Sequence, residues 1–341
     1  MATLLCIIML RRPSTPGLFR DKSIVLPVAR KFGYKQLSRA TKHFSKDNLL
    51  GAGSFGEVYQ GELRDDPCMR LVAVKKLKQH AEQFRKDYVS EIEILGQLNH
   101  RNLVKLVGWC DGGADKQLLV YELVNNGSVD EHLHGPGRPP LGWPERYKIA
   151  LGVGRAIEYL HTGCHNNLAV LHRDIKPSNV LLDEGFEAQL GDFGLVRRVN
   201  PGQSSLGGTR MIGTLAYIDP MCATTSTVST ASDMYSFGVM LLEIATGKKL
   251  VETSDARDLI EDVQKCYHND TVLDMPDKRL SLDDLDERRQ VERILAVGLL
   301  CAQHERQFRP EITIVVKLLS DLSHPLPAPG VRNDSSAELQ I

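Results

Sequence analysis

Residues 172–179 read HRDIKPSN and stand between two apolar runs, LAVL at 168–171 and VLL at 180–182. Pro177 excludes a continuing helix there, because proline lacks the backbone N–H that a helix needs and its ring clashes with the preceding turn. Charged side chains seldom lie in a core without partners. The stretch therefore predicts a loop anchored at both ends, which is either a charged surface turn or a site of chemistry.

A second acidic loop follows, with Asp192-Phe-Gly194 placed after another apolar, strand-like run. Residues 195–220 then form a long segment rich in Gly, Ser and Thr with little apolar periodicity. Loops of that length in compact domains are usually functional or disordered. The sequence thus places two aspartates, Asp174 and Asp192, in separate loops with apolar flanks.

A glycine-rich turn, GAGSFG at 51–56, fits the pattern GxGxxG, which by itself is weak evidence. A dinucleotide-binding turn of the Rossmann type would open a helix at its third glycine, and no helical pattern follows here. Glycines lack Cβ, so backbone N–H groups can approach phosphate oxygens closely. A plain tight hairpin is compatible with the same residues, and we expect a hairpin that can bind phosphate.

The strand after this turn carries two neighbouring lysines. Strand alternation places Ala73 and Lys75 on one face and Lys76 on the other. A nucleotide under the glycine turn needs a small residue and a cation on the same face, which favours Lys75. Its acidic partner is expected to be Glu91 rather than Glu93, because Glu91 lies on the apolar side of the next predicted helix.

The composition is that of an ordinary globular protein. The chain has 341 residues, 42% hydrophobic and 25% charged, which leaves room for two domains or lobes. A net charge of −1 does not indicate nucleic acid as a partner. The seven cysteines are scattered and lack CxxC spacing, which argues against a disulfide framework or a zinc site and favours a reducing compartment.

Periodicity divides the chain into a sheet-rich part up to about residue 125 and a helical part after it. The first part shows four strand-like runs and one amphipathic helix, at 81–98. Further helices are predicted from Pro144 onward and over 231–247, 288–302 and 311–322. The run at 231–247 is apolar nearly all round and ends at Gly247, which predicts a helix buried at the centre of a domain. The order predicts a small sheet-rich lobe followed by a larger helical lobe.

The N-terminus begins with an apolar run, LLCIIML at 4–10, followed by Arg11 and Arg12. The run is too short to span a bilayer, which takes about 20 apolar residues, and a secretory signal would carry its charge before the apolar run. Apolar residues followed by arginine are typical of the cytoplasmic end of a membrane helix. Membrane contact through residues 4–12 and a loosely packed tail both stay open.

Taken together, the motifs G-x-G-x-x-G-x-V, A-V-K, H-R-D-x-x-x-x-N and D-F-G resemble a eukaryotic protein kinase domain over about residues 45–325. Longer matches are similar to plant receptor-like kinases: FGYKQLSRATKHFS, HRNLVKLVGWC, LLVYELVNNGSVDEHL, DIKPSNVLLD and DMYSFGVMLLEIATGK. VGWC and LGDFGLVRR are most similar to the L-type (legume) lectin-domain receptor kinase branch.

The resemblance implies an α+β, bilobal protein-kinase fold. The N-lobe, about 45–124, would be a small antiparallel sheet with one major helix, and the C-lobe, about 125–325, would be mainly helical. Residues 1–44 would be an apolar and basic tail with a juxtamembrane-like linker, and 326–341 a C-terminal tail. Neither a lectin ectodomain nor a full membrane span is seen, so we expect the intracellular part of a receptor or a cytoplasmic relative.

The resemblance also assigns chemistry to matching residues. Asp174 would accept the proton of the substrate hydroxyl, and Lys176 would neutralise charge on the γ-phosphate of ATP. A lysine two residues after the aspartate is the pattern of Ser/Thr kinases. Asn179 and Asp192 would bind Mg²⁺, with Mn²⁺ as an alternative, because hard cations take oxygen ligands.

For ATP itself, Lys75 fixed by Glu91 would bind the α- and β-phosphates. Val58 and Ala73 would sandwich the adenine, with Tyr121 at the back of the pocket and the backbone of 122–124 bonding the base. The candidates for nucleotide binding are Leu50, Gly51, Gly53, Gly56, Val58, Ala73, Lys75, Glu91, Tyr121 and Val124. A stacked column that aligns the lobes, anchored by Asp233, is matched by Leu95, Leu106, His172 and Phe193.

Two residues depart from the family pattern G-T-x-G-Y-x-x-P-E, which here reads GTLAYIDPM over 213–221. Ala216 replaces the second Gly, and Met221 replaces the Glu, which in the family pairs with a buried Arg matched here by Arg309. Removing one partner of a buried pair typically costs about 3–5 kcal/mol. Either the segment docks poorly, or Arg309 reaches water or another acid and Met221 packs as a hydrophobe.

Arg173 precedes Asp174, which by resemblance implies control through phosphorylation of this segment. The nearest acceptors are Ser204, Ser205 and Thr209, and the sequence does not rank them.

Two classes of function follow. The first is an active Ser/Thr kinase that transfers the γ-phosphate of MgATP to protein hydroxyls in receptor-like signalling. The second, resting on Ala216 and Met221, is a nucleotide-binding scaffold with impaired transfer. We expect protein substrates and an upstream receptor or kinase as partners, no nucleic acid, and a cytoplasmic location that includes the membrane face if residues 4–12 contact it. The oligomeric state stays open.

Overall fold

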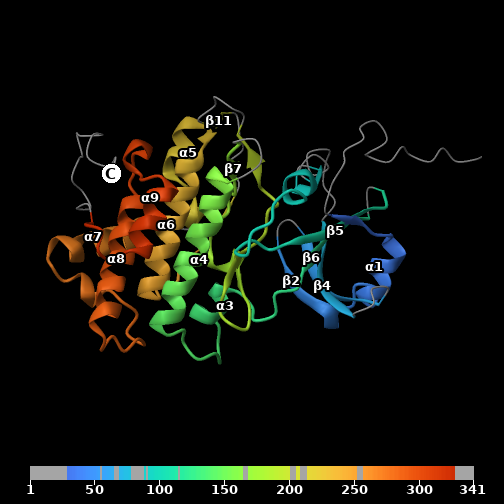
Figure 1. Cartoon of the computed structure of the whole chain (residues 1–341), viewed down its shortest axis with the longest axis horizontal. Coiled ribbons are helices and arrows are strands. Elements are labelled where there is room, and N and C mark those ends of the chain that lie inside the picture. The colour runs from blue at the N-terminus through green and yellow to red at the C-terminus, as the bar shows by residue number, and fades with distance from the viewer. Residues whose placement is uncertain are drawn as a thin grey trace, which may run out of the picture.

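The computed structural model shows two lobes beside each other along the long axis of the molecule (Figure 1). The residues it describes are 29–53, 56–64, 69–77, 88–89, 91–113, 116–163, 168–199, 205–207, 213–251 and 256–326. The predicted membrane-contacting segment at 4–12 and the acceptors Ser204 and Thr209 lie outside these residues.

The described residues of the first lobe contain a six-stranded sheet in the order β1-β5-β6-β4-β3-β2. Its strands are β1 (Arg30–Lys31), β2 (Leu49–Ala52), β3 (Gly56–Leu63), β4 (Arg70–Leu77), β5 (Leu106–Asp111) and β6 (Gln117–Glu122). Strands β2 to β6 pair antiparallel, as predicted, whereas β1 pairs parallel to β5. The sheet is therefore mixed rather than purely antiparallel.

The two faces of the sheet pack against different cores. Val72 and Val74 of β4 are fully buried in a small core with Leu37 of α1 (Tyr34–Ala40). Ala73 and Lys75 alternate with them, and their cross-strand partners on β6, Tyr121 and Leu119, belong to the main core. Lys75 thus lies on the face opposite α1, toward the second lobe.

The segment 29–44 was expected to be linker, and the structure places it on the sheet. The Phe32 N–H donates to the Trp109 carbonyl at 2.8 Å, and β1 pairs with Gly108 and Trp109. A Cβ at Gly108 would lie 2.1 Å from the Arg30 carbonyl oxygen, so β1 fits only because this position is glycine. Two paired residues carry too little periodicity to be predicted from sequence.

The second lobe is mainly helical, as predicted. Its longer helices are α4 (Trp143–Thr162), α6 (Thr230–Thr246), α7 (Arg257–His268), α8 (Leu285–Cys301) and α9 (Ile312–Ser320). Short helices are α3 (Val129–His134) and α5 (Pro220–Thr225). Of the predicted 81–98 helix, the described residues 88–89 and 91–95 are helical, and a turn at 96–97 ends it earlier than predicted.

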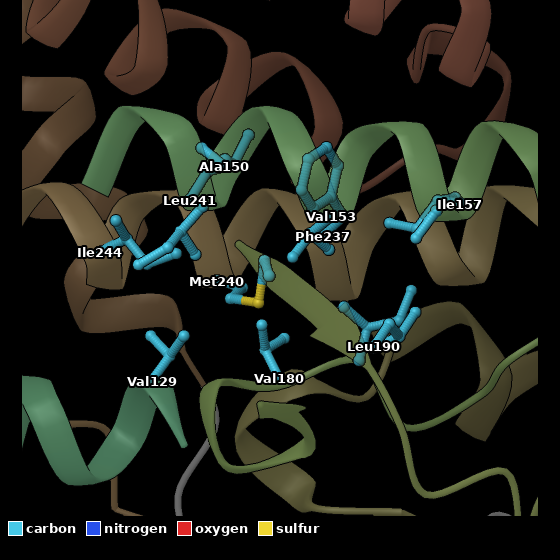
Figure 2. Packing of buried hydrophobic residues seen from close by; sticks show 14 of the residues in the cluster. Val129, Ala150, Val153, Ile157, Val180, Leu190, Phe237, Met240, Leu241 and Ile244 are labelled. Atoms are coloured by element: carbon cyan, nitrogen blue, oxygen red, sulfur yellow. The ribbon is translucent and has the colours of Figure 1, made fainter. Parts of the chain in front are cut away.

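Helix α6 lies at the centre of this lobe, since residues 233–246 are buried on every side. Figure 2 shows Phe237, Met240 and Leu241 of α6 packing beside Val153 and Ile157 of α4. Gly247 has φ 64° and ends α6, as the sequence predicted, because glycine adopts this left-handed conformation without strain.

The described residues between α4 and α6 also form short strands, some of which flank the predicted loops. They are β7 (Val170–Leu171), β8 (Val180–Leu182), β9 (Ala188–Leu190), β10 (Arg197–Arg198), β11 (Leu206–Gly207) and β12 (Thr227–Val228). Strands β8 and β9 form an antiparallel hairpin in which Val180 lies opposite Leu190, so the 172–179 loop and the 191–194 loop leave the hairpin at the same end. The pairings of β10 with β7 and of β11 with β12 were not predicted. Among the described residues, none of the helices has the length and apolarity that a bilayer crossing requires.

Candidate active site

The loop at 172–179 is tied down by one buried carboxylate. Asp233 of α6 accepts the backbone N–H of His172 at 2.9 Å and that of Arg173 at 2.8 Å, and His161 Nε2 lies 2.9 Å from the same carboxylate. Arg173 has φ 73°, a conformation that an L-residue adopts only when its surroundings impose it. Asp233 therefore fixes the backbone immediately before Asp174.

Asp174 is 5% exposed, and its side chain has a defined orientation. Its Oδ2 accepts Asn179 Nδ2 at 2.9 Å and lies 3.1 Å from Lys176 Nζ, while its Oδ1 accepts the Thr214 N–H at 3.4 Å. Lys176 Nζ also donates to Thr214 Oγ1 at 2.6 Å. The carboxylate, the ammonium and the start of the 213–221 segment thus form one cluster.

Asp192 approaches the same place from the second loop. The Gly191 N–H donates to the Asn179 carbonyl at 2.8 Å, which joins the two loops. His172 Nε2 bonds the Gly191 carbonyl at 3.0 Å, and its ring packs edge-on against Phe193 with centroids 5.0 Å apart. Asp192 itself has φ 55°, so this second loop also has a constrained backbone.

Lys75 reaches across from the sheet to this cluster. Its Nζ lies 2.9 Å from Asp192 Oδ1 and 3.6 Å from Glu91 Oε1. Burial alone would lower the pKa of Lys75, but the carboxylates of Asp192 and Glu91 outweigh it and raise that pKa above its ordinary value. Burial likewise opposes the charge on Asp192, and Lys75 outweighs it so that the pKa of Asp192 is lowered. The charged pair Lys75–Asp192 is the favoured state.

Glu91 is held from a second side, because the Tyr121 hydroxyl donates to Glu91 Oε1. Glu91 is 2% exposed, and burial raises its pKa against the opposing effect of Lys75 and of this hydrogen bond. Tyr121 therefore links β6 of the sheet to Glu91, the carboxylate that contacts Lys75.

The glycine-rich turn lies at the end of the β2–β3 hairpin. Its backbone closes through a hydrogen bond from the Gly53 N–H to the Gly56 carbonyl at 2.9 Å. A Cβ at Gly56 would lie 2.4 Å from the Lys76 carbonyl, whereas Cβ atoms at Gly51 and Gly53 would meet nothing within 4 Å. Close approach of β4 accordingly requires glycine only at the third position.

Comparison with known families decides the identity of this arrangement. Residues 44–319 match the family model described as protein tyrosine and serine/threonine kinase. The chain belongs to the protein kinase family. The bilobal kinase fold implied by the sequence motifs is therefore confirmed, and kinases of this family use ATP together with a divalent metal ion.

Receptor-like kinases are among the curated relatives of this kinase domain. The chain is 41% identical over 305 residues to L-type lectin-domain containing receptor kinase IX.1 of Arabidopsis thaliana, covering 87% of this chain and 45% of that protein. It is 39% identical over 310 residues to proline-rich receptor-like protein kinase PERK13 of the same organism, covering 89% and 42%. The chain thus spans less than half the length of these two relatives.

The adenine-site candidates of the kinase domain line the sheet between its turn and β6. Val58 pairs with Lys75, and Ala73 pairs with Tyr121, so these residues occupy neighbouring strands. Val124 follows β6 and is half-buried, and Leu50 on β2 is exposed. The Glu122 N–H donates to the Lys105 carbonyl at 3.0 Å, which fixes the backbone at the end of β6.

The structure resolves the alternatives for Arg309 at the end of the 213–221 segment. Arg309 Nη2 donates to Asp219 Oδ1 at 2.8 Å, and both side chains are fully buried. Arg309 thus reaches another acid, two residues before Met221. Asp219 and Thr214 were not predicted as site residues from the sequence. A signal for Asp219 was present, because an Asp before Pro220 is a favoured helix N-cap.

The donor set suits a divalent cation. Asn179 uses Nδ2 to bond Asp174, which turns its Oδ1 away from that carboxylate and leaves it as an acceptor. Asp192 offers a carboxylate in the adjoining loop, and its side chain is 35% exposed. Hard oxygen ligands of this kind fit Mg²⁺ or Mn²⁺, in agreement with the general use of a divalent ion by the family.

Proposed function

We propose that this chain is an active serine/threonine protein kinase that transfers the γ-phosphate of ATP to hydroxyl groups of protein substrates. The observation that supports this most is the cluster in which Lys176 Nζ lies 3.1 Å from Asp174 Oδ2 and 2.6 Å from Thr214 Oγ1. A carboxylate and an ammonium fixed side by side can accept a proton and neutralise phosphate charge in the same step.

In the proposed reaction, Asp174 accepts the hydroxyl proton and orients the oxygen toward the phosphate. Asn179 Nδ2 and the Thr214 N–H hold the carboxylate in place, so its orientation is set before the substrate arrives. Lys176 neutralises charge on the transferred phosphoryl group, and Lys75, positioned by Glu91, binds the remaining phosphates.

Asn179 Oδ1 and the Asp192 carboxylate would hold Mg²⁺, which when bound neutralises charge between the phosphates. Lys75 pairs with Asp192 in this structure, so nucleotide binding is expected to redistribute the partners of both side chains. The glycine-rich turn supplies backbone N–H groups for the phosphates, with Gly51 and Gly53 leaving space beside them.

The scaffold alternative rests on Ala216 and Met221. The pairing of Arg309 with Asp219 supports the active kinase instead, because it gives the buried guanidinium a counter-ion without a glutamate at position 221. The test is phosphate transfer by the purified chain, with MgATP and a basic protein substrate, followed by identification of the phosphorylated residue. Phosphoserine and phosphothreonine are expected. Nucleotide binding without transfer would instead establish the scaffold.

We further propose that the kinase domain occupies about 45–325, with its lobes meeting near residue 124. The segment 29–44, which packs on the sheet, then precedes that domain, and its contacts with β5 support treating it as an accessory part of the N-lobe. We also propose protein substrates, an upstream receptor or kinase as partner, and a cytoplasmic location that includes the face of the membrane. The likeness to receptor kinases supports these proposals.

A further inference from the structure

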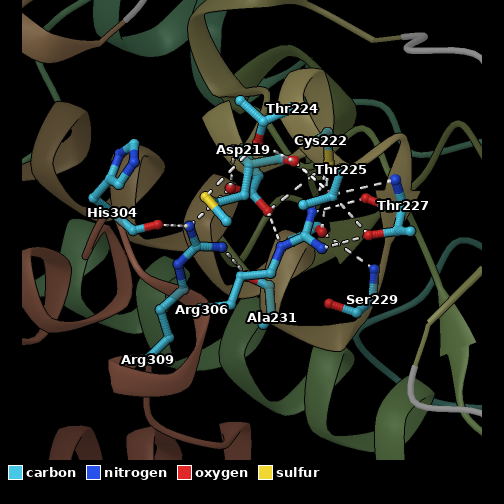
Figure 3. A network of polar contacts seen from close by, with 12 residues as sticks. Asp219, Cys222, Thr224, Thr225, Thr227, Ser229, Ala231, His304, Arg306 and Arg309 are labelled. Carbon is cyan, nitrogen blue, oxygen red and sulfur yellow. Dashed lines mark hydrogen bonds and ion pairs between the residues drawn. The ribbon is translucent and has the colours of Figure 1, made fainter.

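Asp219 lies at the end of the 213–221 segment, which we call the docking segment, and its carboxylate is saturated. Its Oδ1 accepts Arg309 Nη2 at 2.8 Å and the Met221 N–H at 3.0 Å, and its Oδ2 accepts Arg306 Nε at 2.7 Å. Figure 3 shows the two guanidinium groups converging on this one side chain. The residue is 1% exposed, so the whole charge is compensated inside the protein.

Arg309 depends on this carboxylate for its neutralisation. Three further N–H groups bond backbone carbonyls, from Nε to Gln303, from Nη1 to Ala231 and from Nη2 to His304. Among the described residues, Asp219 is the one carboxylate that forms an ion pair with Arg309. Without Asp219, a fully buried guanidinium would keep its charge and lose its counter-ion.

Met221, which stands where the family pattern has Glu, does not contribute an acceptor to Arg309. Its backbone N–H bonds Asp219, and its sulfur accepts Thr224 Oγ1 at 3.9 Å. The counter-ion of Arg309 is therefore Asp219, the N-cap of α5, and not the residue at position 221 in the first turn of that helix.

The docking segment is anchored at its other end to the active site. Thr214 contacts both Asp174 and Lys176, and between the two ends Ser236 Oγ donates to the Tyr217 carbonyl at 2.7 Å. Arg306 adds a further link, because it bonds the Thr227 carbonyl at 2.7 Å and so connects Asp219 to β12. Asp219 and Asp174 thus hold opposite ends of one short stretch of chain.

We propose that Asp219 is the positioning residue of this kinase, taking over from the family's glutamate the neutralisation of the buried arginine and thereby holding the docking segment against Asp174. The effect of Asp219 on phosphate transfer rests on the proposed function. Its neutralisation of Arg309 rests on the geometry alone.

Four variants test it: Asp219→Asn, Met221→Glu, the double variant carrying both, and Asp284→Asn as a matched control. Asn caps helices about as well as Asp, so Asp219→Asn removes the charge and keeps the cap. Asp284 caps α8 by accepting the Asp286 N–H at 2.6 Å, so its change to Asn measures any effect of altering a cap alone. In the double variant, Glu at position 221 restores an acid at the family's own position.

Asp219→Asn should lower kcat/KM for the protein substrate roughly 10- to 100-fold, as displacement of a distant positioning group can. The Kd for ATP should change by less than about twofold in every variant, because none touches that site. Met221→Glu and Asp284→Asn should keep wild-type turnover, and the double variant should recover most of what Asp219→Asn loses. Wild-type turnover in Asp219→Asn, or no recovery in the double variant, would overturn the proposal.

Hydrogen exchange of residues 213–225 provides a readout that needs no turnover. Exchange should accelerate in Asp219→Asn, return toward wild type in the double variant, and stay unchanged in Asp284→Asn. If the wild-type chain transfers no phosphate, the proposed function fails, while this exchange pattern still decides the role of Asp219. Unchanged exchange in Asp219→Asn would refute that role.

Discussion

Asp233→Asn is the substitution that most severely tests how the catalytic loop is held. The carboxylate accepts two backbone N–H groups and lies 2.9 Å from His161 Nε2, at 1% exposure. Asparagine keeps one acceptor oxygen and replaces the other by an NH₂ group. That group must face either the Arg173 N–H or the pair formed by the His172 N–H and His161, so a donor meets a donor.

The magnitude follows from these contacts. Hydrogen bonds to a charged group contribute about 1.5–3 kcal/mol each, and a buried donor left without an acceptor costs about 1–3 kcal/mol. At least one backbone bond is lost and the others lose their ionic character, so we expect the free energy of unfolding to fall by about 3–5 kcal/mol. Arg173 would also lose the restraint on its positive φ, and kcat should fall with it.

Urea unfolding at neutral pH measures the first effect, and steady-state turnover below the unfolding temperature measures the second. Asp262→Asn is the matched control, because Asp262 pairs with Lys248 at 2.8 Å on the surface with both side chains 49% exposed. Its loss should cost less than about 1 kcal/mol. Equal stability and equal kcat for the Asp233 and Asp262 variants would refute the role given to Asp233.

Three further predictions concern acid stability and packing. Burial alone would raise the pKa of Asp233, but His161 and the two backbone N–H groups hold that pKa below its ordinary value. The stability that Asp233 contributes is therefore present above about pH 4 and is lost as pH falls through its folded pKa. Between pH 6 and 3, the free energy of unfolding in urea should fall less for Asp233→Asn than for wild type. Gly108→Ala should displace β1 and lower stability by about 1–3 kcal/mol, whereas Gly33→Ala, which meets nothing within 4 Å, should not; equal proteolysis near residue 30 in both would contradict this. Tyr121→Phe removes the hydroxyl that bonds Glu91 and should cost about 1–3 kcal/mol in thermal unfolding, so an unchanged melting temperature would show that this bond contributes little.

The sequence predicted those parts of the fold whose signals are local and strong. Helix α6 is apolar nearly all round and ends at Gly247, and the structure confirms its buried position and its end at this glycine, which is left-handed. The motif residues occupy the expected loops, since Asp174 follows β7 and Asp192 follows β9. Each of these features depends on the spacing of residues within one short stretch of chain, so it can be predicted from a single sequence.

Contacts between distant segments could not be predicted in the same way. The parallel pairing of β1 with β5 depends on the absence of a side chain at Gly108. No hydrophobic periodicity in the sequence predicts this pairing. The sequence left open whether Arg309 has a counter-ion, because it does not show that Asp219 points toward the loop at 303–309. The family pattern shows that position 221 has changed from Glu to Met. It does not show that Asp219 supplies the counter-ion of Arg309 instead.

The most direct test compares wild type with Asp174→Asn in two measurements on the same samples, the Kd for MgATP and the single-turnover rate of phosphate transfer to a protein substrate. The two structures should differ by one carboxylate oxygen, which accepts Asn179 Nδ2 and adjoins Lys176 in the wild type. We expect wild type to bind nucleotide and transfer phosphate, and the variant to bind as tightly while its rate falls by about 10²–10⁴-fold. Undiminished transfer by Asp174→Asn would contradict the assignment of Asp174 as the base.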